Sequence, residues 1–280
     1  MTTRKTLNHV VVAVKQVPDT TQVKVDPATG TLIREGVPFI MNPFDTHAVE
    51  EALRLKDRFG CLVTAVTMGP PNAAATLRKC LALGVDDVVL VSDRAFGGAD
   101  TLATSYVLSE VIRRVEKEQG RVDLVICGKQ TIDGDTAQVG PGIAVRLNYC
   151  LLTLVDRILD ISGAERTITV RRKLEGRREV VRALMPACLT LVREVNEPRY
   201  PKVPNRLMAE TAEIPVWDNQ FLQLSLSRVG LKGSPTHVKK IFAPERARGE
   251  ILGDAENDPE GAVALLIRRL IEKDLISVGR

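Results

Sequence analysis

Aromatic residues, long apolar runs and paired cysteines are all scarce in this chain of 280 residues. With six Phe, three Tyr and one Trp, a site for a flat ring would have to hold that ring mostly without aromatic stacking. No apolar run approaches the ~20 residues that a membrane-spanning helix needs. The first such run, residues 10–14, stops at Lys15 and lacks a small-residue cleavage site, which indicates a strand and not a signal peptide. We therefore expect no direct membrane insertion.

The cysteines, at positions 61, 80, 127, 150 and 188, are odd in number and include no Cys-x-x-Cys pair. This spacing gives little support to a disulfide framework, a structural zinc site or a cysteine-ligated cluster. Most of them lie in apolar segments, where cysteine packs as a small core residue. A reducing, cytoplasmic location is the expectation that fits this usage.

Charge of one sign is also lacking, because 39 Lys and Arg face 35 Asp and Glu and leave a formal net charge of +4. A nucleic-acid-binding protein usually carries a basic excess on one face, so we expect no nucleic-acid partner. Hydrophobic residues at 44% and charged residues at 26% are typical of a globular protein with a large core.

Strand-like and helix-like segments alternate through the first half of the chain. Continuous apolar runs predict strands at residues 9–14, 62–67, 88–91 and 122–127. Apolar residues on a helical period predict helices at residues 46–59, 73–83, 100–117 and about 136–147. This alternation predicts an α/β fold with a mostly parallel sheet and helices on both of its faces.

The pattern changes after about residue 151. Alternating residues on either side of Glu175-Gly176 predict a hairpin over residues 167–184, and another short strand is expected at residues 188–192. Prolines recur from residue 196 onward, which favours an extended arm that gains order against a partner, with a final helix at residues 259–273. We therefore predict an α/β domain over residues 1–195 and a partner-packing arm over residues 196–280.

Ligands bind beyond the carboxyl ends of the strands in a parallel sheet, so the segment after each strand is a candidate site. After the fourth strand, residues 133–136 (DGDT) predict a tight turn that ends at a helix cap, and residues 140–142 (GPG) keep side chains off the helix start. Free N–H groups there would suit a phosphate, although an ordinary capped helix has the same pattern. Because no GxxxxGK[ST] or GxGxxG follows a strand, neither a P-loop nor a standard dinucleotide-binding loop is present.

The segment after the third strand has the same character. Gly97-Gly98 permits backbone conformations that a side chain would forbid. Thr101 and Thr104 share one face of the helix that follows, where their hydroxyls would bind the polar edge of a ring or would only cap and pack. The positive end of that helix dipole would favour a ring that gains negative charge on reduction.

No acid–base, nucleophile or metal-ligand constellation is visible, since the three histidines lie in a strand, in a helix and in the arm. We therefore predict no metal site and no catalytic side chain. Nucleotide-binding loops without such groups are typical of a redox carrier in which a cofactor supplies the chemistry.

Several motifs together resemble the β subunit of electron-transfer flavoprotein. They follow the order seen in that family and span most of the chain, as AVKQVPDT (13–20), MNPFDTHAVEEALRLK (41–56), VTMGPP (66–71), GKQTIDGDTAQVGP (128–141) and NEPRYPKVPN (196–205). Two further segments, SDRAFGGADTLATS (92–105) and GSPTHVKKIFAP (233–244), resemble the electron-bifurcating branch of the family. The fold that this resemblance implies is a Rossmann-like, adenine nucleotide-binding one.

The resemblance implies a site for FAD or, in ordinary members, for a structural AMP. Residues 93–104 would hold the flavin ring, with Thr101 and Thr104 as hydrogen-bond donors. The cofactor-binding residues that it implies are Ala13, Lys15, Asn42, Phe44, Asp45, Thr67, Met68, Gly69, Asp93, Ala95, Phe96, Gly98, Ala99, Asp100, Thr101, Thr104, Gly128, Lys129, Gln130, Asp133, Gly134, Asp135, Thr136, Gln138 and Val139.

The partners that the resemblance implies are a flavin-binding α subunit, NADH as electron donor, a ferredoxin or flavodoxin, and an acyl-CoA dehydrogenase or quinone oxidoreductase. Val203 stands where many ordinary members have a leucine in the loop that docks the dehydrogenase, so it keeps a shorter apolar knob. Two alternatives stay open at this point. One is a non-bifurcating β subunit that holds structural AMP, and the other is an ATP-binding regulatory domain similar to the universal stress proteins.

Overall fold

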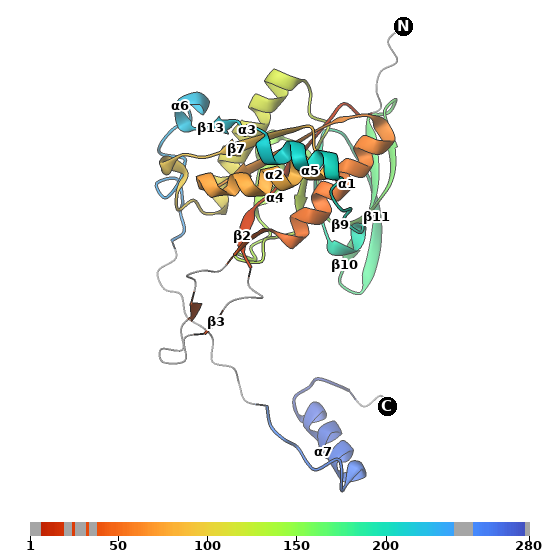
Figure 1. Cartoon of the computed structure of the whole chain (residues 1–280). Coiled ribbons are helices and arrows are strands. Elements are labelled where there is room, and N and C mark those ends of the chain that lie inside the picture. The colour runs from red at the N-terminus through yellow and green to blue at the C-terminus, as the bar shows by residue number, and fades with distance from the viewer. Residues whose placement is uncertain (1–6, 20–23, 26–31, 34–37, 238–248, 278–280) are drawn as a thin grey trace. The chain divides into compact units, whose positions relative to one another are not determined.

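The computed structural model describes residues 7–19, 24–25, 32–33, 38–237 and 249–277 (Figure 1). Residues 1–240 and 241–280 form two separate compact units. The described residues of the first unit contain the large sheet and all but one of the helices described here, and the second unit contains α7 (Pro259–Glu272). No helix in the described part of the chain has the length and apolarity that crossing a membrane requires.

A sheet of nine strands runs through the described part of the first unit, in the order β11-β10-β9-β12-β8-β1-β6-β7-β13. All neighbours are parallel except the pairs β9–β10 and β10–β11. The strands are β1 (His9–Ala13), β6 (Leu62–Met68), β7 (Asp87–Val91), β8 (Leu124–Gly128), β9 (Cys150–Ser162), β10 (Thr167–Leu174), β11 (Arg177–Leu184), β12 (Ala187–Leu191) and β13 (Val216–Trp217). Two small antiparallel pairs stand apart, namely β2 (Gln16–Pro18) with β5 (Phe39–Met41), and β3 (Lys24–Val25) with β4 (Leu32–Ile33).

Helices cover both faces of the parallel part of the sheet. One core packs α1 and α2 against side chains such as Val10, Val12 and Leu124, and the other packs α3 and α4 against Val11 and Val125. Successive strand residues point to opposite faces, so each apolar strand supplies both cores. The helices of this unit are α1 (Pro43–Phe59), α2 (Ala74–Leu83), α3 (Thr101–Gln119), α4 (Val139–Leu147), α5 (Val203–Thr211) and α6 (Asn219–Leu222), with single 3-10 turns η2 (Pro71–Ala73), η3 (Arg94–Phe96) and η4 (Arg193–Val195).

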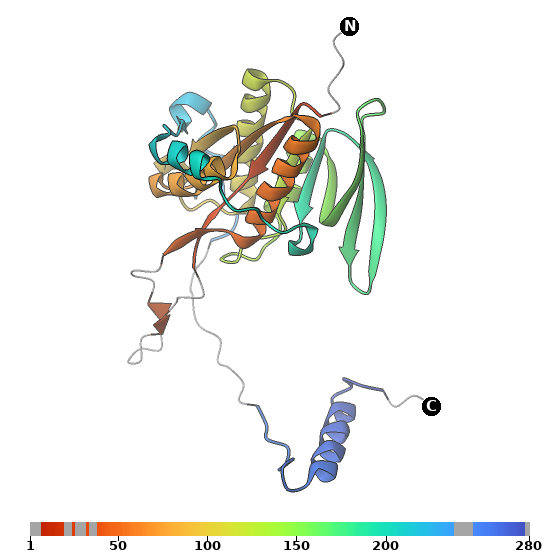
Figure 2. The same cartoon turned by 45° about the vertical axis from the view of Figure 1, so that its right-hand side comes forward.

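This architecture confirms the predicted α/β class, the mostly parallel sheet and the hairpin. The sequence pattern missed β9, which pairs with both β12 and β10 and carries the antiparallel extension seen clearly in Figure 2. The start of α4 was also misplaced. Asp135 and Ala137 have φ angles of 51° and 54°, which are left-handed, so the helix begins only at Val139 and Thr136 is not its cap.

Part of the Pro-rich segment belongs to the first unit and packs on its helices and sheet. Helix α5 lies against α2, and β13 adds a strand to the sheet beside β7. Arg199 donates to Glu50 and Asp57 of α1, which fixes the start of this segment. The division that we predict at residue 195, with an arm that packs on a partner, stays a prediction.

Candidate functional site

The strand order reverses between β1 and β8. From β1 the chain runs outward through β6 and β7 and then returns to β8 on the other side of β1, where strands β9 to β12 also lie. Ligands of doubly wound sheets bind in the crevice beyond the carboxyl ends of the two strands at such a switch point. The two loops that leave β1 and β8 here contain Lys15 and Lys129, and both loops belong to the predicted cofactor site.

Asn42 and Asp45, at the start of α1, join these two loops. Asp45 accepts hydrogen bonds from the backbone N–H of Lys15 at 2.8 Å and from that of Gly128 at 3.2 Å. Asn42 donates to the carbonyl of Gln130 at 2.9 Å and accepts from the N–H of Ile132 at 3.2 Å. The NPFD segment, residues 42–45, therefore holds the two loops that border the crevice in a fixed position relative to each other.

The carboxyl of Asp45 is almost completely removed from water, with 4% of the residue exposed. Burial raises its pKa to about 7, although the N–H groups of Lys15 and Gly128 favour the charged form and act in the opposite direction. The two hydrogen bonds from backbone N–H groups explain why a carboxyl group can be buried here.

The tips of the two loops meet through an ion pair. Lys15 Nζ lies 2.6 Å from Asp133 Oδ2, and both side chains are partly exposed. Burial alone would raise the pKa of Asp133, but the hydrogen bond from Lys15 holds it below its usual value. Gln130 donates to Asp135 at 2.7 Å and closes the rest of the β8 loop.

Glycines in and after the β8 loop serve close packing. A Cβ on Gly128 would lie 2.3 Å from the carboxylate of Asp45, so only glycine lets the loop approach α1. A Cβ on Gly140 would lie 2.6 Å from Thr190, and one on Gly142 would lie 2.6 Å from Ser105. The GPG segment thus brings α4 close to β12 and α3, which is a packing role beside the phosphate-binding role that we predict.

The β6 loop contributes Thr67, Met68 and Gly69 to the predicted site. Thr67 is fully buried, and its Oγ1 has no hydrogen-bond partner among the described residues. Gly69 N–H donates to Val91 O at 3.1 Å, so this loop is tied to the neighbouring β7 loop. A buried hydroxyl without a partner is unusual in proteins.

The β7 loop is organised by two aspartates. Asp93 caps η3 through the N–H of Ala95, and Asp100 caps α3 through the N–H groups of Leu102 and Ala103. Asp100 is therefore the N-cap of α3, a role for which the sequence had also allowed Thr101 and Thr104. Both threonines lie on the first turn of α3, where the positive end of its dipole is close.

The structure brings the predicted residues of the β1 and β8 loops into direct contact and places those of the β6 and β7 loops on the same edge of the sheet. Phe96 differs from its neighbours, because its side chain is 4% exposed and packs in the core under α3. Ala13, Met68, Ala95 and Val139 also pack against that core while partly exposed. The two lysines and two threonines on this edge can donate to a phosphate or to the polar edge of a ring, whereas two N–H groups at the start of α3 already donate to Asp100.

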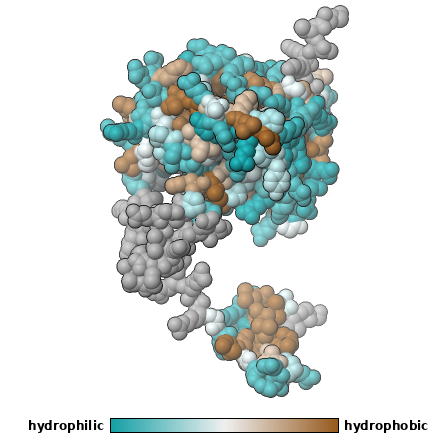
Figure 3. Space-filling model, viewed as in Figure 1, coloured by the Kyte–Doolittle hydropathy of each residue, from teal (hydrophilic) through white to brown (hydrophobic). Residues whose placement is uncertain are grey.

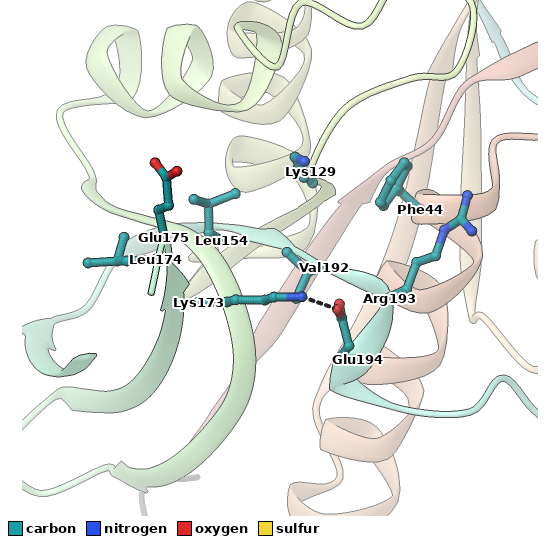
Figure 4. Close-up of a pocket in the computed structure, with 9 residues that line it drawn as sticks. All are labelled: Phe44, Lys129, Leu154, Lys173, Leu174, Glu175, Val192, Arg193 and Glu194. Carbon is teal, nitrogen blue, oxygen red and sulfur yellow. Dashed lines mark hydrogen bonds and ion pairs between the residues drawn. The ribbon is translucent and has the colours of Figure 1, made fainter. Parts of the chain in front are cut away.

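A pocket of about 420 Å³ adjoins the crevice on the side of β12 (Figure 4). Two predicted cofactor residues, Phe44 and Lys129, line it, and the guanidinium of Arg193 lies 4.9 Å from the Phe44 ring centre. Residues that sequence reasoning missed complete it. They come from β9, the β10–β11 hairpin and the segment that follows β12, and they are Leu154, Lys173, Leu174, Glu175, Val192, Arg193 and Glu194.

The segment with the predicted docking residue presents an apolar surface. Val203 is 71% exposed at the start of α5, and Tyr200, Leu207 and Met208 beside it are also exposed. Figure 3 shows apolar surface over α5 in this view. The C-terminal end of α5 is held by Arg78, which donates to the carbonyls of Ala209, Glu210 and Ala212.

Known proteins are similar in sequence to this chain over nearly its whole length. A family model described as the electron transfer flavoprotein domain matches residues 29–222. Protein FixA of Azotobacter vinelandii is 50% identical over 265 residues, which cover 94% of each protein. The caffeyl-CoA reductase-Etf complex subunit CarD of Acetobacterium woodii is 46% identical over 271 residues, covering 96% of this chain and 100% of CarD.

The electron transfer flavoprotein subunit beta of Clostridium acetobutylicum is 44% identical over 269 residues, covering 96% of this chain and 100% of that protein. The residues that the family model matches include the segments that build the switch-point crevice, from the NPFD segment to the β8 loop. From the match of the domain model and from these relatives, the chain belongs to the electron transfer flavoprotein family, in the group of its β subunits and FixA proteins.

Proposed function

We propose that this chain is the β subunit of a heterodimeric electron-transfer flavoprotein that binds FAD and bifurcates electrons. In the complex, NADH gives a hydride, one electron goes to a low-potential ferredoxin or flavodoxin, and the other goes to the FAD of the α subunit. A dehydrogenase, such as an acyl-CoA dehydrogenase, or a quinone oxidoreductase then receives the second electron. The names of CarD, a subunit of a reductase-Etf complex, and of the clostridial β subunit support an electron-transfer complex.

The chain's own residues would bind and orient the cofactor. Lys15 and Lys129 supply positive charge to phosphates at the switch point, while Asn42 and Asp45 fix the loops that carry them. A bound flavin would supply the hydride-accepting and electron-carrying chemistry. Thr101 and Thr104 would donate to the polar edge of its ring, and the start of α3 would stabilise negative charge there.

One observation carries the choice of FAD over AMP. Two segments, residues 92–105 and 233–244, resemble the bifurcating branch, and the described part of the second, residues 233–237, contacts the first in the structure. Asp100 of the first segment accepts hydrogen bonds from Thr236 of the second, and its N–H donates to Ser234. A pocket of about 410 Å³ lies at this contact. The non-bifurcating alternative does not need a ring pocket here, because AMP has no ring beyond its adenine.

The remaining surfaces support the proposed partners. The exposed side chains of α5 around Val203 form an apolar surface that fits a docking dehydrogenase, and α7 has an exposed apolar face that fits the α subunit. We propose that the arm over residues 196–280 holds these partners and that the heterodimer is cytoplasmic.

Counting flavins in the complex tests the proposal. The chain is purified with its α subunit, and the FAD and AMP released on denaturation are quantified before NADH is added under anaerobic conditions. Two FAD per heterodimer and bleaching of both by NADH are expected. One FAD with AMP beside it and no bleaching would instead establish the structural-AMP alternative, and ATP without flavin would establish a regulatory domain.

Replacing the two threonine hydroxyls tests the ring site. Thr101→Val with Thr104→Val should lower the FAD retained by the chain or alter its reduction by NADH, because two donors to a buried ring are lost. Thr169→Val, in strand β10, is a control for the same chemical change away from the site. Unchanged flavin content and reduction in the double variant would contradict this assignment.

A further inference from the structure

We propose that a basic surface on the first turns of α3 and the end of α4 docks a small acidic protein that carries one electron. The surface consists of Leu102, Arg113, Val145, Arg146 and Arg228, and it is called the α3–α4 surface below. Its position and its charge follow from contacts among the described residues. The kind of partner rests on the proposed function, in which one electron of each hydride leaves the complex on such a carrier.

Arg146, in α4, is held against the first turns of α3. Its Nε donates to Ser105 Oγ at 3.3 Å, and its Nη2 donates to the carbonyl of Leu102 at 3.1 Å. A guanidinium has five N–H donors, and these two bonds leave donors for a further acceptor. The carbonyl of Arg146 accepts from Arg113, which brings a second arginine of α3 to the same place.

Arg228 reaches this place from a segment much later in the chain. Its guanidinium carbon lies 3.8 Å from the centre of the Tyr106 ring, and that of Arg146 lies 5.9 Å from the same centre. Because Tyr106 is buried in α3, its ring is a fixed support to which cation–π attraction holds both guanidiniums. Two positive charges are therefore held close together beside one ring.

These two charges have no carboxylate partner in the part of the chain that the structure describes. Arg113, by contrast, forms an ion pair with Glu110 at 2.5 Å. Like charges at such close range repel each other, and carboxylates of a binding partner would offset that repulsion. Complementary charge also speeds the encounter of two proteins and fixes their orientation, so the α3–α4 surface fits an acidic partner.

Two apolar side chains complete the surface. Leu102 is 50% exposed and Val145 is 78% exposed, and both adjoin Arg146, one through its carbonyl and the other as its neighbour in the chain. The helices beneath them are closely packed, because a Cβ on Gly142 would lie 2.6 Å from Ser105. A small apolar patch among fixed charges suits a transient encounter, and such electron-transfer interfaces bury less than about 1,200 Å².

The surface begins beside the proposed ring site. Leu102 lies between Thr101 and Thr104 on the first turn of α3, so a docked carrier would approach the ring without entering the phosphate crevice. The electrons balance, because a hydride from NADH brings two of them. The carrier takes one, the FAD of the α subunit takes the other, and the proton of the hydride returns to water.

Binding of a purified acidic ferredoxin to the heterodimer tests the proposal. Titration calorimetry gives the Kd at about 0.01 M and about 0.15 M salt, between which the reach of a surface charge falls from about 30 Å to about 8 Å. Arg146→Gln with Arg228→Gln should raise the Kd about tenfold at low salt and weaken its salt dependence, because two charges are lost. Arg58→Gln is the matched control, since its guanidinium also lies over a ring, 4.8 Å from the centre of Phe59, where α1 ends.

Two further variants separate charge from folding. Val145→Glu places a carboxylate on the surface at an exposed position and should also raise the Kd about tenfold, whereas Arg228→Lys keeps the charge and should bind as the wild type does. Stopped flow gives a second readout. Ferredoxin that has been reduced beforehand should reduce the flavin of the double variant about tenfold more slowly, and reduced methyl viologen, a cationic donor, should reduce both proteins at the same rate.

Equal Kd values for the double variant and Arg58→Gln would overturn the proposal. So would a Val145→Glu variant that no longer assembles with the α subunit or that splits a larger assembly, because the α subunit or a second copy of this chain would then cover the surface. If the heterodimer contains AMP in place of its second FAD, the proposed function fails, while the Kd values still decide whether this surface docks the acidic carrier.

Discussion

Asp45 is the residue on which the geometry of the crevice depends most. It is buried, its pKa is raised to about 7 by removal from water, and it holds the first residues of two loops. A carboxyl whose pKa is higher in the folded than in the unfolded chain stabilises the fold fully below the unfolded value of about 3.9. This stabilisation is lost as pH rises from about 4 toward 7.

Replacing Asp45 by Asn should remove this pH dependence. The stability of the wild type relative to Asp45→Asn should fall as pH rises from 4 to 7, by up to about 1.4 kcal/mol for each pH unit. Urea unfolding at several pH values measures the difference, and Glu118→Gln on the exposed face of α3 is the control. A difference that stays constant across this range would show that Asp45 is charged in the folded chain.

Local sequence patterns and the family resemblance predicted residues for the site, but they did not predict the contacts that those residues make. Asn42 and Asp45 lie in a motif that the family resemblance supplied, yet their bonds reach residues more than 80 positions away, and no local pattern encodes such bonds. Gly140 and Gly142 illustrate the opposite problem. Spacing left open both a phosphate-binding role and an ordinary capped helix for them, whereas the side chains they avoid, Thr190 and Ser105, belong to elements whose placement needs the fold.

At the scale of elements, periodicity predicted the helices and strands whose burial is regular. The sequence pattern did not predict strand β9 because the backbone of this strand is irregular. Leu154 has a φ of 57°, and the register with β10 shifts twice. Such bulges interrupt the alternation on which strand prediction depends. Helix α5 was not predicted for another reason. The prolines in and before it indicate an extended chain, whereas contacts with α2 hold the helix in place.

Helix α5 should therefore depend on Arg78, whose guanidinium meets three carbonyls at the end of the helix. Arg78→Met should lower the free energy of unfolding by about 1–2 kcal/mol, because three carbonyls, two of them in partly buried hydrogen bonds, lose a charged donor. Amides of residues 203–211 should exchange faster as well. Lys79→Met, at the exposed neighbouring position, is the control, and equal exchange in both variants would show that α5 is stable without Arg78.

At the scale of the whole molecule, the chain divides into a unit that carries the crevice and a unit that carries α7. Helix α7 is well formed by itself, since Asp258 caps it and Arg269 pairs with Glu250 and Glu272. Its apolar residues are nevertheless exposed, with Val263 at 53% and Leu266 and Ile267 at 45% each. In Figure 3 apolar surface covers much of this helix, which is unusual for a face that stays in water.

Leu266→Asp tests whether this face holds the α subunit. A charge in the middle of an apolar interface leaves an unpaired carboxylate on binding, so the Kd of the heterodimer should rise at least tenfold. The Tm of the first unit should not change, because neither of its cores contains a residue of α7. Titration calorimetry with the α subunit measures the Kd, and Arg268→Ser on the same helix is the control. Equal affinity of Leu266→Asp and the control would mean that the partner is held elsewhere, and that α7 is not the partner-binding part of the arm.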